Sequence, residues 1–358
     1  MPKRRRHGEL ACCRERLYLV FDDWCHGYTI REVNLLPGKN HQTAVTGHAS
    51  VRRFRKPFSR TVARRRSPKL SLPGENHRQT TVIGHAAVRR FPKPSFRMVA
   101  RRWCPKFFMS AFGTRILAMQ PRDPEGDLSE RYFPTLDVRS RAAAISPAPE
   151  WLMGTIHYLP VGNKLFTLSG EALEMLCLDD MEWSWKELSK QPFNVLDVTS
   201  YSLHPEEQTF QVSTKKDVIE ATFAFDTDKL SWKLLGSFFF AINYLAPFVG
   251  RGHFDLRLNG FVGLSKEPDT LGKIYGNVNA HTATLFYMGS HSKFCIVQCV
   301  SIENDAGRRY MYRLTTFSLR HDEHGEPMTG KIHEVQYYKV PKATTKSFLV
   351  EDLVAFWM

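Results

Sequence analysis

The chain has 358 residues, 42% of them hydrophobic, and its 25 Phe, 12 Tyr and 7 Trp favour half-buried strands over helices. Its net charge of +14 is uneven, because residues 1–108 contain 25 Lys and Arg against 6 Asp and Glu, which leaves −5 for residues 109–358. The longest stretch without a charged residue or a histidine, residues 234–250, has 17 residues. A spanning helix needs about 20 apolar residues, so we expect neither a membrane span nor a membrane partner.

The first 37 residues predict a basic tail followed by two strands. Residues 1–9 are basic and lack an apolar run of secretory length, and seven scattered cysteines show no CxxC pair. We therefore expect reduced thiols and an intracellular protein, in the nucleus or the cytoplasm. Residues 10–37 hold two alternating runs, 16–22 and 28–33, which predict an antiparallel opening pair.

Residues 36–70 and 72–107 are two near-copies of one arginine-rich segment. With one extra residue in the second copy, Arg78, 24 of 35 aligned positions are identical. Such close copies indicate a recent duplication, so we predict that residues 38–106 form a basic insertion that is largely disordered. The end of the second copy, residues 96–102, also fits a genuine strand, and in that case only one copy is surplus.

The basic tail and the repeats are candidate contacts for a nucleic acid or for a nuclear-import receptor. Arginines pair with phosphates and aromatic rings stack on unpaired bases, and the repeats mix both residue types. No RNP, KH or zinc-finger pattern accompanies them, so a solvated segment is the first interpretation and nucleic-acid binding the alternative. The candidate residues are Lys3, Arg4, Arg5, Arg6, Arg52, Arg53, Arg55, Lys56, Arg64, Arg65, Arg66, Arg89, Arg90, Lys93, Arg101 and Arg102.

Residues 107–358 consist of short alternating runs bounded by turn residues, which is typical of antiparallel meanders. The clearest hairpin is residues 255–264, where Asn259 and Gly260 predict a type I′ turn. Cys295 and Cys299 lie four apart in one expected strand, so both point to one side, and we predict that they are buried.

Aspartates that follow a strand mark a longer period. These markers are Asp22, Asp137, Asp179, Asp226 and Asp322. Their spacing is 42 to 48 residues once residues 38–106 are removed and one unseen marker is placed near residue 274. A unit of this size is typical of a four-stranded propeller blade, so we predict one all-β propeller of about six blades, with five and seven open. Residues 350–357 are expected to close the ring by pairing near the N-terminus.

Two aspartates of this series, Asp179 and Asp226, are each followed six residues later by a tryptophan. This spacing, with residues 185–193 after it, resembles a kelch blade, although the single Gly162 stands where kelch repeats have a glycine pair. Other segments are similar to a large grass-plant family of uncharacterised proteins, domain of unknown function 1668. These are residues 16–24, 111–121, 161–166, 283–290, 313–319 and 355–358.

The resemblance covers nearly the whole chain outside the repeats. It implies a kelch-like plant propeller and brings no activity or site with it. The F-box that is common at the N-terminus of plant kelch proteins is missing, because residues 10–33 predict strands. A role as a ubiquitin-ligase adaptor therefore loses its main support.

No GxSxG elbow, P-loop, GxGxxG or HExxH motif is present in the sequence. The histidines of residues 321–325 fall where a polar hairpin tip is expected. Asp22 and Asp23 are neighbours on an expected strand, so they point to opposite faces and do not form an acid and base pair. We therefore predict no catalytic residue, no metal and no cofactor.

The expected organisation is a basic tail (1–9), the first propeller strands (10–37), the insertion (38–106) and the remainder of the propeller (107–358). We predict a non-enzymatic scaffold of kelch-like type that binds a protein partner with loops on one face of the ring. Propellers serve as enzymes and as scaffolds, so two alternatives stay open. One is a nucleic-acid-associated protein that uses the repeats, and the other is an enzyme with its site in the central channel.

Overall fold

The structure is a computed structural model, and nearly all of the residues that it describes lie in strands. The one helical element among them is a 3-10 turn, η2 (Val195–Asp197). The predicted all-β class is confirmed. The described residues are 16–24, 27–35, 88–99, 107–111, 113–119, 132–147, 157–162, 164–170, 172–179, 182–204, 208–239, 248–258, 260–265, 280–289, 292–304, 307–323, 327–344 and 354–358.

The strands form five sheets, which we number as blades in chain order. Blade 1 contains β23 (Ala355–Trp357), β1 (Leu17–Trp24), β2 (Gly27–Val33) and β4 (Phe96–Val99). Blade 2 contains β5 (Phe107–Ala111), β6 (Arg115–Met119), β7 (Tyr132–Asp137) and β8 (Ala142–Pro147). Blade 3 contains β9 (His157–Val161), β10 (Lys164–Leu168), β11 (Leu173–Asp179) and β12 (Glu182–Leu188).

The last two sheets carry additional strands. Blade 4 contains β13 (Val198–His204), β14 (Thr209–Lys216), β15 (Ile219–Asp226) and β16 (Ser231–Phe239), and its sheet continues into β17 (Phe248–Asp255) and β18 (Gly260–Ser265). Blade 5 contains β19 (Ala280–Tyr287), β20 (Lys293–Asn304), β21 (Gly307–His321) and β22 (Pro327–Lys339), and its sheet continues into β3 (Arg89–Arg90).

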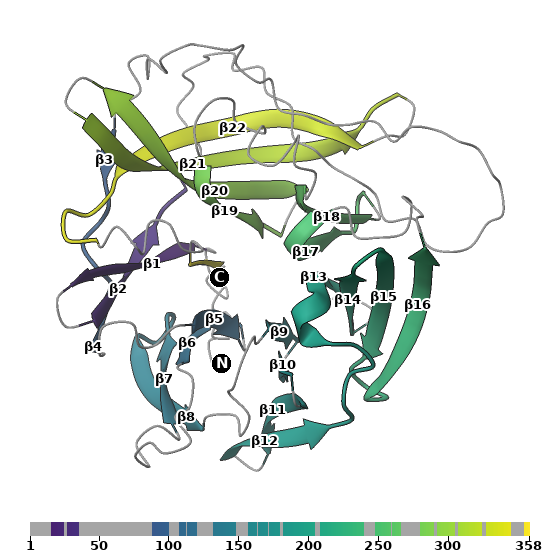
Figure 1. Ribbon diagram of the computed structural model, residues 1–358. Coiled ribbons are helices and arrows are strands. Elements are labelled where there is room, and N and C mark those ends of the chain that lie inside the picture. The colour runs from purple at the N-terminus through teal and green to yellow at the C-terminus, as the bar shows by residue number, and fades with distance from the viewer. Residues whose placement is uncertain are drawn as a thin grey trace, which may run out of the picture.

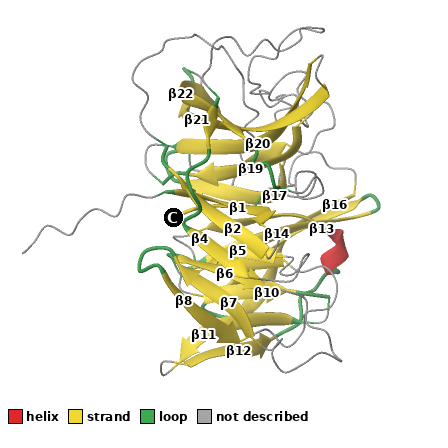
Figure 2. Cartoon of the chain, turned by 90° about the vertical axis from the view of Figure 1, so that its left-hand side faces the viewer, coloured by secondary structure: helices red, strands yellow, loops and turns green. Residues whose placement is uncertain are grey.

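The blades are arranged in a ring, with β5, β9 and β13 near the centre and β8, β12 and β16 at the rim (Figure 1). The fold is therefore a β-propeller, and the predicted range of five to seven blades includes the five observed sheets. Figure 2 shows the ring edge-on, with η2 on one of its faces. None of the helical structure in the described ranges is long and apolar enough to cross a membrane.

The two ends of the described chain close the ring. β23 pairs antiparallel with β1, and Leu17 lies opposite Trp357. The backbone N–H of Met358 donates to the carbonyl of Arg16 at 3.0 Å. The C-terminal strand thereby completes a sheet that begins at the N-terminus, and the predicted closure is confirmed.

The hairpin of β17 and β18 lies between blades 4 and 5 (Figure 1). β17 joins β13 in a parallel pairing, and Ser200 lies opposite Gly250. The sixth blade marker that we expected near residue 274 lies outside the described residues. Among those residues, the hairpin adds two strands to blade 4 and does not form a separate four-stranded sheet.

Hydrophobic side chains fill the spaces between neighbouring blades. Between blades 1 and 5, Leu19 and Phe21 of β1 belong to the same core cluster as Cys295 and Cys299 of β20. Both cysteines are 0% exposed, as predicted, and burial raises the pKa of the Cys299 thiol to about 12. These thiols therefore serve as apolar packing groups at physiological pH.

The aspartate markers identify equivalent places in four blades. Asp137, Asp179 and Asp226 are the last residues of β7, β11 and β15, each the third strand of its blade. Asp322 directly follows β21, the third strand of blade 5. Asp22 departs from the series because it lies in β1, which is the second strand of blade 1 after β23 has taken the first position.

The shared spacing from aspartate to tryptophan misleads about which tryptophans are equivalent. Trp232 lies opposite Phe225, the residue before Asp226, whereas the residue before Asp179 lies opposite Trp183. The turn after Asp179 is two residues shorter, since Asp179 pairs with Glu182 and Asp226 pairs with Ser231. Trp183, and not Trp185, is therefore the structural counterpart of Trp232.

The predicted hairpin of residues 255–264 is present, but its turn is not the two-residue turn expected at Asn259 and Gly260. Asp255 pairs with Gly260, so the loop has four residues. The Asp255 carboxylate is 0% exposed and accepts hydrogen bonds from the Leu258 N–H and the Ser292 hydroxyl, both at 2.9 Å. This buried carboxylate stabilises the longer loop by satisfying its backbone.

Two strands come from within residues 38–106. β4 pairs with β2 as the outer strand of blade 1, and β3 pairs in parallel with β22. The interpretation in which the end of the second copy supplies a genuine strand is therefore confirmed for residues 96–99. Residues 36–87 and 100–106 lie outside the described residues, so the predicted disorder of the insertion stays a prediction.

Candidate protein-interaction surface

Three of the sixteen predicted contact residues, Arg89, Arg90 and Lys93, belong to the described part of the chain, and all three are exposed. The other thirteen lie outside it. They are Lys3, Arg4, Arg5, Arg6, Arg52, Arg53, Arg55, Lys56, Arg64, Arg65, Arg66, Arg101 and Arg102.

The described basic residues belong to a segment that is held on the propeller, and we call residues 88–94 the anchor segment. The Phe91 ring stacks on Tyr338, with centroids 4.6 Å apart, and lies 4.9 Å from the Phe21 ring. Arg89 reaches the carboxylate of Glu334 at 3.6 Å. The anchor segment thus joins blade 1 to blade 5 and is not a free basic arm.

The outermost strands of the blades differ in charge. β4, β12 and β16 each carry at least one Lys, Arg or Glu, and the edge of blade 5 is covered by the two arginines of β3. β8 alone among these outer strands has no charged residue, with the sequence AlaAlaAlaIleSerPro. Charged side chains on edge strands prevent unwanted pairing with other chains. The rim edge of blade 2 therefore lacks the charge that the rim edges of the other blades carry, as does β18 at the other end of the blade 4 sheet.

One face of the hairpin of β7 and β8 is apolar and exposed. Ile145 is 73% exposed and lies opposite Pro134, which is also exposed. Tyr132 is 52% exposed and lies opposite Pro147. Together with the edge of β8, beyond which no further strand lies in the described part of the chain, these four residues make a surface that we call the β8 surface. It lies at the rim of the ring (Figure 1).

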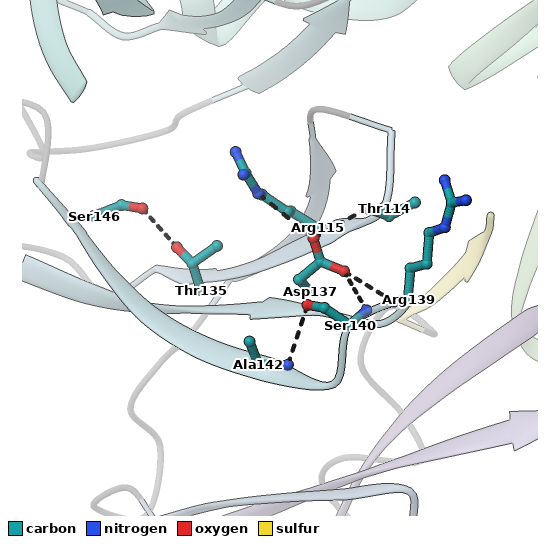
Figure 3. Close-up of polar contacts among 8 residues, drawn as sticks. All are labelled: Thr114, Arg115, Thr135, Asp137, Arg139, Ser140, Ala142 and Ser146. Carbon is teal, nitrogen blue, oxygen red and sulfur yellow. Dashed lines mark hydrogen bonds and ion pairs between the residues drawn. The ribbon is translucent and has the colours of Figure 1, made fainter. Parts of the chain in front are cut away.

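The opposite face of the same hairpin is buried and fixed. Phe133 and Thr135 are at most 3% exposed, and Phe133 packs in the core between blades 2 and 3. The hydroxyls of Thr135 and Ser146 are 2.7 Å apart (Figure 3). Alternate residues along each strand point to opposite faces, so this burial directs Pro134 and Ile145 outward.

The turn between β7 and β8 is held by Asp137 (Figure 3). Its Oδ1 accepts hydrogen bonds from the backbone N–H groups of Arg139 and Ser140, both at 2.9 Å. Its Oδ2 accepts from the Thr114 hydroxyl at 3.3 Å and lies 3.9 Å from Nε of Arg115. The hairpin is thus tied to β6, and its edge is presented in one fixed position.

These contacts favour the ionised form of Asp137. Partial burial acts against the charge, but the hydrogen bonds from Ser140, Arg139 and Thr114 outweigh it, so the pKa of Asp137 lies below its ordinary value of 3.8. The carboxylate is therefore charged at neutral pH, and both of its oxygens accept hydrogen bonds from neighbouring residues of the protein.

Two arginines stand at the tip of this turn. Arg139 and Arg141 are both exposed, and the Arg139 side chain points away from Asp137 (Figure 3). Arg141, the fourth residue after Asp137, has a positive φ of 58°. The equivalent residue of blade 4, Leu230, which is the fourth after Asp226, also has a positive φ, of 51°. The two arginines give the apolar edge a positively charged end.

The other end of β8 is closed by blade 3. The indole N–H of Trp185 donates to the carbonyl of Pro147 at 2.9 Å. The guanidinium of Arg115 lies 4.9 Å from the centre of the Trp183 ring. Because Arg115 lies beside Asp137, Trp183 is on the side of the turn, and Trp185 contacts the Pro147 end. The open part of β8 is therefore bounded by Trp185 at one end and by the arginine-bearing turn at the other.

The described part of the central region offers no comparable chemical site. No group of three or more His, Cys, Asp or Glu residues able to hold a metal occurs among the described residues. Burial and the neighbouring Arg251 lower the pKa of His253 to about 3. Its ring is therefore neutral at pH 7, and Nε2 lies 2.9 Å from the Leu285 carbonyl in a structural contact.

The sequence alone did not identify the β8 surface. Its signal was the absence of charge from residues 142–147, beside aspartate markers that had already predicted a strand ending at Asp137. Such a segment also fits an ordinary buried strand. Only the position of β8 at the end of its sheet shows that it is exposed.

Comparison with known proteins identifies a family without a known activity. A family model described as "Protein of unknown function (DUF1668)" matches residues 14–280. This match agrees with the family resemblance found in the sequence, whereas the grass-plant origin and the kelch type stay predictions. No curated protein matches the sequence.

Several solved structures show weak likeness. Hydrazine synthase of Kuenenia stuttgartiensis is 11% identical with a TM-score of 0.33, over 59% of this chain and 61% of that chain. TolB from Acinetobacter baumannii is 10% identical with a TM-score of 0.32, over 64% of this chain and 67% of that chain. Likeness at this level carries no argument about function.

Proposed function

The chain belongs to the DUF1668 family of proteins of unknown function, and on that premise we propose that it is a non-enzymatic protein-interaction scaffold. Its partner binds as an extended segment that pairs with the open edge of β8 in blade 2. The observation that carries this proposal is the uncharged, solvent-exposed outer strand, which contrasts with the charged outer strands of the other blades.

The physical basis is β-augmentation. An edge strand presents a row of unpaired N–H and C=O groups, and an added strand gains affinity from them while side-chain contacts supply specificity. Here Asp137 and the Thr135 to Ser146 contact fix the strand in advance, so little conformational freedom is lost on binding.

The chemistry of the surface defines the partner. Exposed Ile145 and Tyr132 favour apolar side chains at alternate positions of the bound segment. Arg139 and Arg141 at the turn favour an Asp or Glu where the segment passes the tip. We therefore expect an extended segment with alternating apolar residues and an acidic residue at one end.

The two alternatives receive less support. For nucleic-acid binding through the repeats, Phe91 and Arg89 have another explanation. Phe91 packs on Tyr338 within the propeller, and Arg89 lies beside Glu334. An enzyme with its site in the central channel stays an alternative, which would need convergent polar groups there. The kelch type and the nuclear or cytoplasmic location remain parts of the proposal.

A selection from random linear peptides displayed on phage tests the proposal. We expect wild-type protein to enrich peptides with apolar residues at alternate positions and an acidic residue at one end. An Ile145→Lys variant should bind the enriched peptides at least about tenfold more weakly, which corresponds to about 1.4 kcal/mol. Leu234→Lys is the matched control, because Leu234 is also an exposed apolar residue on an outer strand, at 52%.

Two outcomes would overturn this function. One is that no peptide family is enriched. The other is that the enriched peptides bind Ile145→Lys as well as they bind the wild type. Sedimentation of the wild type and of Ile145→Lys measures their oligomeric state. A wild-type dimer that Ile145→Lys abolishes would show that the edge binds a second copy of this chain and not a different partner.

A further inference from the structure

The anchor segment occupies a defined aromatic site between blades 1 and 5. Phe91 contacts three rings, because it also lies 5.7 Å from Tyr312 in addition to its contacts with Phe21 and Tyr338. Phe21 and Tyr312 are at most 1% exposed. The site is therefore built by the propeller core and is filled by a side chain from the repeats.

Polar contacts define the rest of this site. Arg31 donates from Nη1 to the carbonyl of Pro92 at 2.6 Å, and Glu334 lies 3.6 Å from Nη2 of Arg89. β3 adds a short parallel pairing in which Arg89 lies opposite Tyr338. The site thus recognises a basic residue, an aromatic residue two positions later, and the backbone that follows.

The first repeat copy carries the same recognition sequence. Residues 51–57 match the anchor segment at six of seven positions, with Arg55 in place of Pro92. Phe54 corresponds to Phe91, and the contact of Arg31 with position 92 is to the backbone carbonyl, which any residue provides. We infer that residues 51–57 are a second ligand for the aromatic site, so that two segments of one chain compete for it.

The chain allows this exchange within one molecule. Leu35, the last described residue before the first copy, packs against the same core cluster as Phe91. Arg52 lies 17 positions after Leu35, whereas Arg89 lies 54 positions after it. Closing the shorter loop costs less conformational entropy, so reach does not disfavour the first copy.

The strand that follows explains why the second copy holds the site. Met98 of β4 is 5% exposed and packs with Phe96 against the core between blades 1 and 2. The corresponding residues of the first copy are Thr61 and Ser59, which bury less apolar surface. The second copy therefore fills both the aromatic site and the outer position of blade 1 better.

A double-mutant cycle in the full-length chain tests the exchange. We expect Phe91→Ala to lower the melting temperature only slightly, because Phe54 takes the site, and Phe54→Ala to have no effect. The combined variant should lose several times more than the two single losses together. Phe58→Ala is the control, since Phe58 aligns with Ser95 and not with an anchor residue.

Hydrogen exchange measured by mass spectrometry identifies which copy is bound. In Phe91→Ala we expect residues 89–99 to lose protection and residues 51–62 to gain it. If Phe91→Ala alone destabilises the protein as much as the combined variant, or if it does not fold, the inference is overturned. A concentration-dependent dimer of Phe91→Ala would also overturn the intramolecular exchange, because the ligand would then come from a second chain.

A deletion supplies a second measurement if the combined variant does not fold. Removing residues 70–106 joins Lys69 to Phe107 and leaves only the first copy. We expect this variant to fold with a lower melting temperature than the wild type and to protect residues 51–62. A variant that stays unfolded would contradict the inference. These experiments involve blades 1 and 5, so they do not depend on the proposed role of β8.

Discussion

The outer edges of blades 5 and 2 differ, because one is covered by a further strand and the other is open. β22 of blade 5 is covered at Tyr338 and Lys339 by β3, which comes from more than 200 residues earlier in the chain. β8 of blade 2 has no strand beyond it among the described residues and carries no charge. The chain therefore covers one edge with a distant segment while it leaves a more apolar edge open.

This difference indicates that the open edge is not simply a by-product of the fold. Edge protection is available to this chain through charged residues, as on β12 and β16, and through an added strand, as on blade 5. An unprotected apolar edge favours aggregation unless a partner covers it. The comparison thus supports binding at β8 and structural closure at the anchor segment.

The largest expected effect on stability comes from removing the buried Phe21 side chain, against which Phe91 of the anchor segment packs. Phe21 is 0% exposed and contacts Phe91 and Tyr312, so Phe21→Ala should lower the free energy of unfolding by about 3–5 kcal/mol. Urea unfolding followed by circular dichroism measures this loss. Val218→Ala, at a position 52% exposed, is the control and should change stability by less than about 0.5 kcal/mol. A loss below about 1 kcal/mol for Phe21→Ala would show that the aromatic site contributes little.

Much of the ring was predictable from the sequence. The alternating pattern of residues 16–33 predicted β1 and β2, and the C-terminal residues predicted the closing strand. The aspartate markers succeeded where each aspartate ends a third strand, as Asp137 and Asp226 do. These features are local, because a strand followed by a carboxylate that caps a turn needs only a few neighbouring residues.

The features that failed depend on distant parts of the chain. Asp22 is not equivalent to the other markers, because the first strand of blade 1 comes from the C-terminus. The sequence around Phe91 is rich in Arg, Lys and Pro and predicts exposure, yet rings from β1, β21 and β22 surround it. The exposure of Ile145 likewise depends on where the sheet ends.

A smaller effect should follow from loosening the hairpin that presents the open edge. Asp137→Ala removes two backbone hydrogen bonds and the contact with Thr114, and we expect it to cost about 1–2 kcal/mol. Chemical denaturation of the variant and the wild type measures the change. Asp226→Ala is the matched comparison, because Asp226 makes the same turn bonds to Asp228 and Lys229. Its Oδ2 accepts from the exposed Lys229 Nζ within the same turn and not from a residue beside a neighbouring strand, so its loss should be smaller. Equal losses would show that the tie to β6 adds nothing.

The same carboxylate should make part of the stability depend on pH. The folded pKa of Asp137 lies below 3.8, so its contribution is fully present well above that pH and is lost as the pH falls through the folded value. We therefore expect the stability difference between wild type and Asp137→Ala to narrow on acidification below about pH 4. Denaturation midpoints of the two proteins between neutral pH and pH 3 measure this narrowing. A difference that grows on acidification would contradict the pKa direction.

The smallest change in stability should come from the open edge itself. Ile145 is 73% exposed, so Ile145→Lys removes little buried surface and should alter the free energy of unfolding by less than about 0.5 kcal/mol. Because a lysine on an edge strand opposes pairing with another chain, the variant should also stay soluble at higher concentration than the wild type. Light scattering across a concentration series checks this, with Leu234→Lys as the control for added charge. If both lysine variants improve solubility equally, net charge explains the effect, and the contrast between the β8 edge and the other rims loses its support.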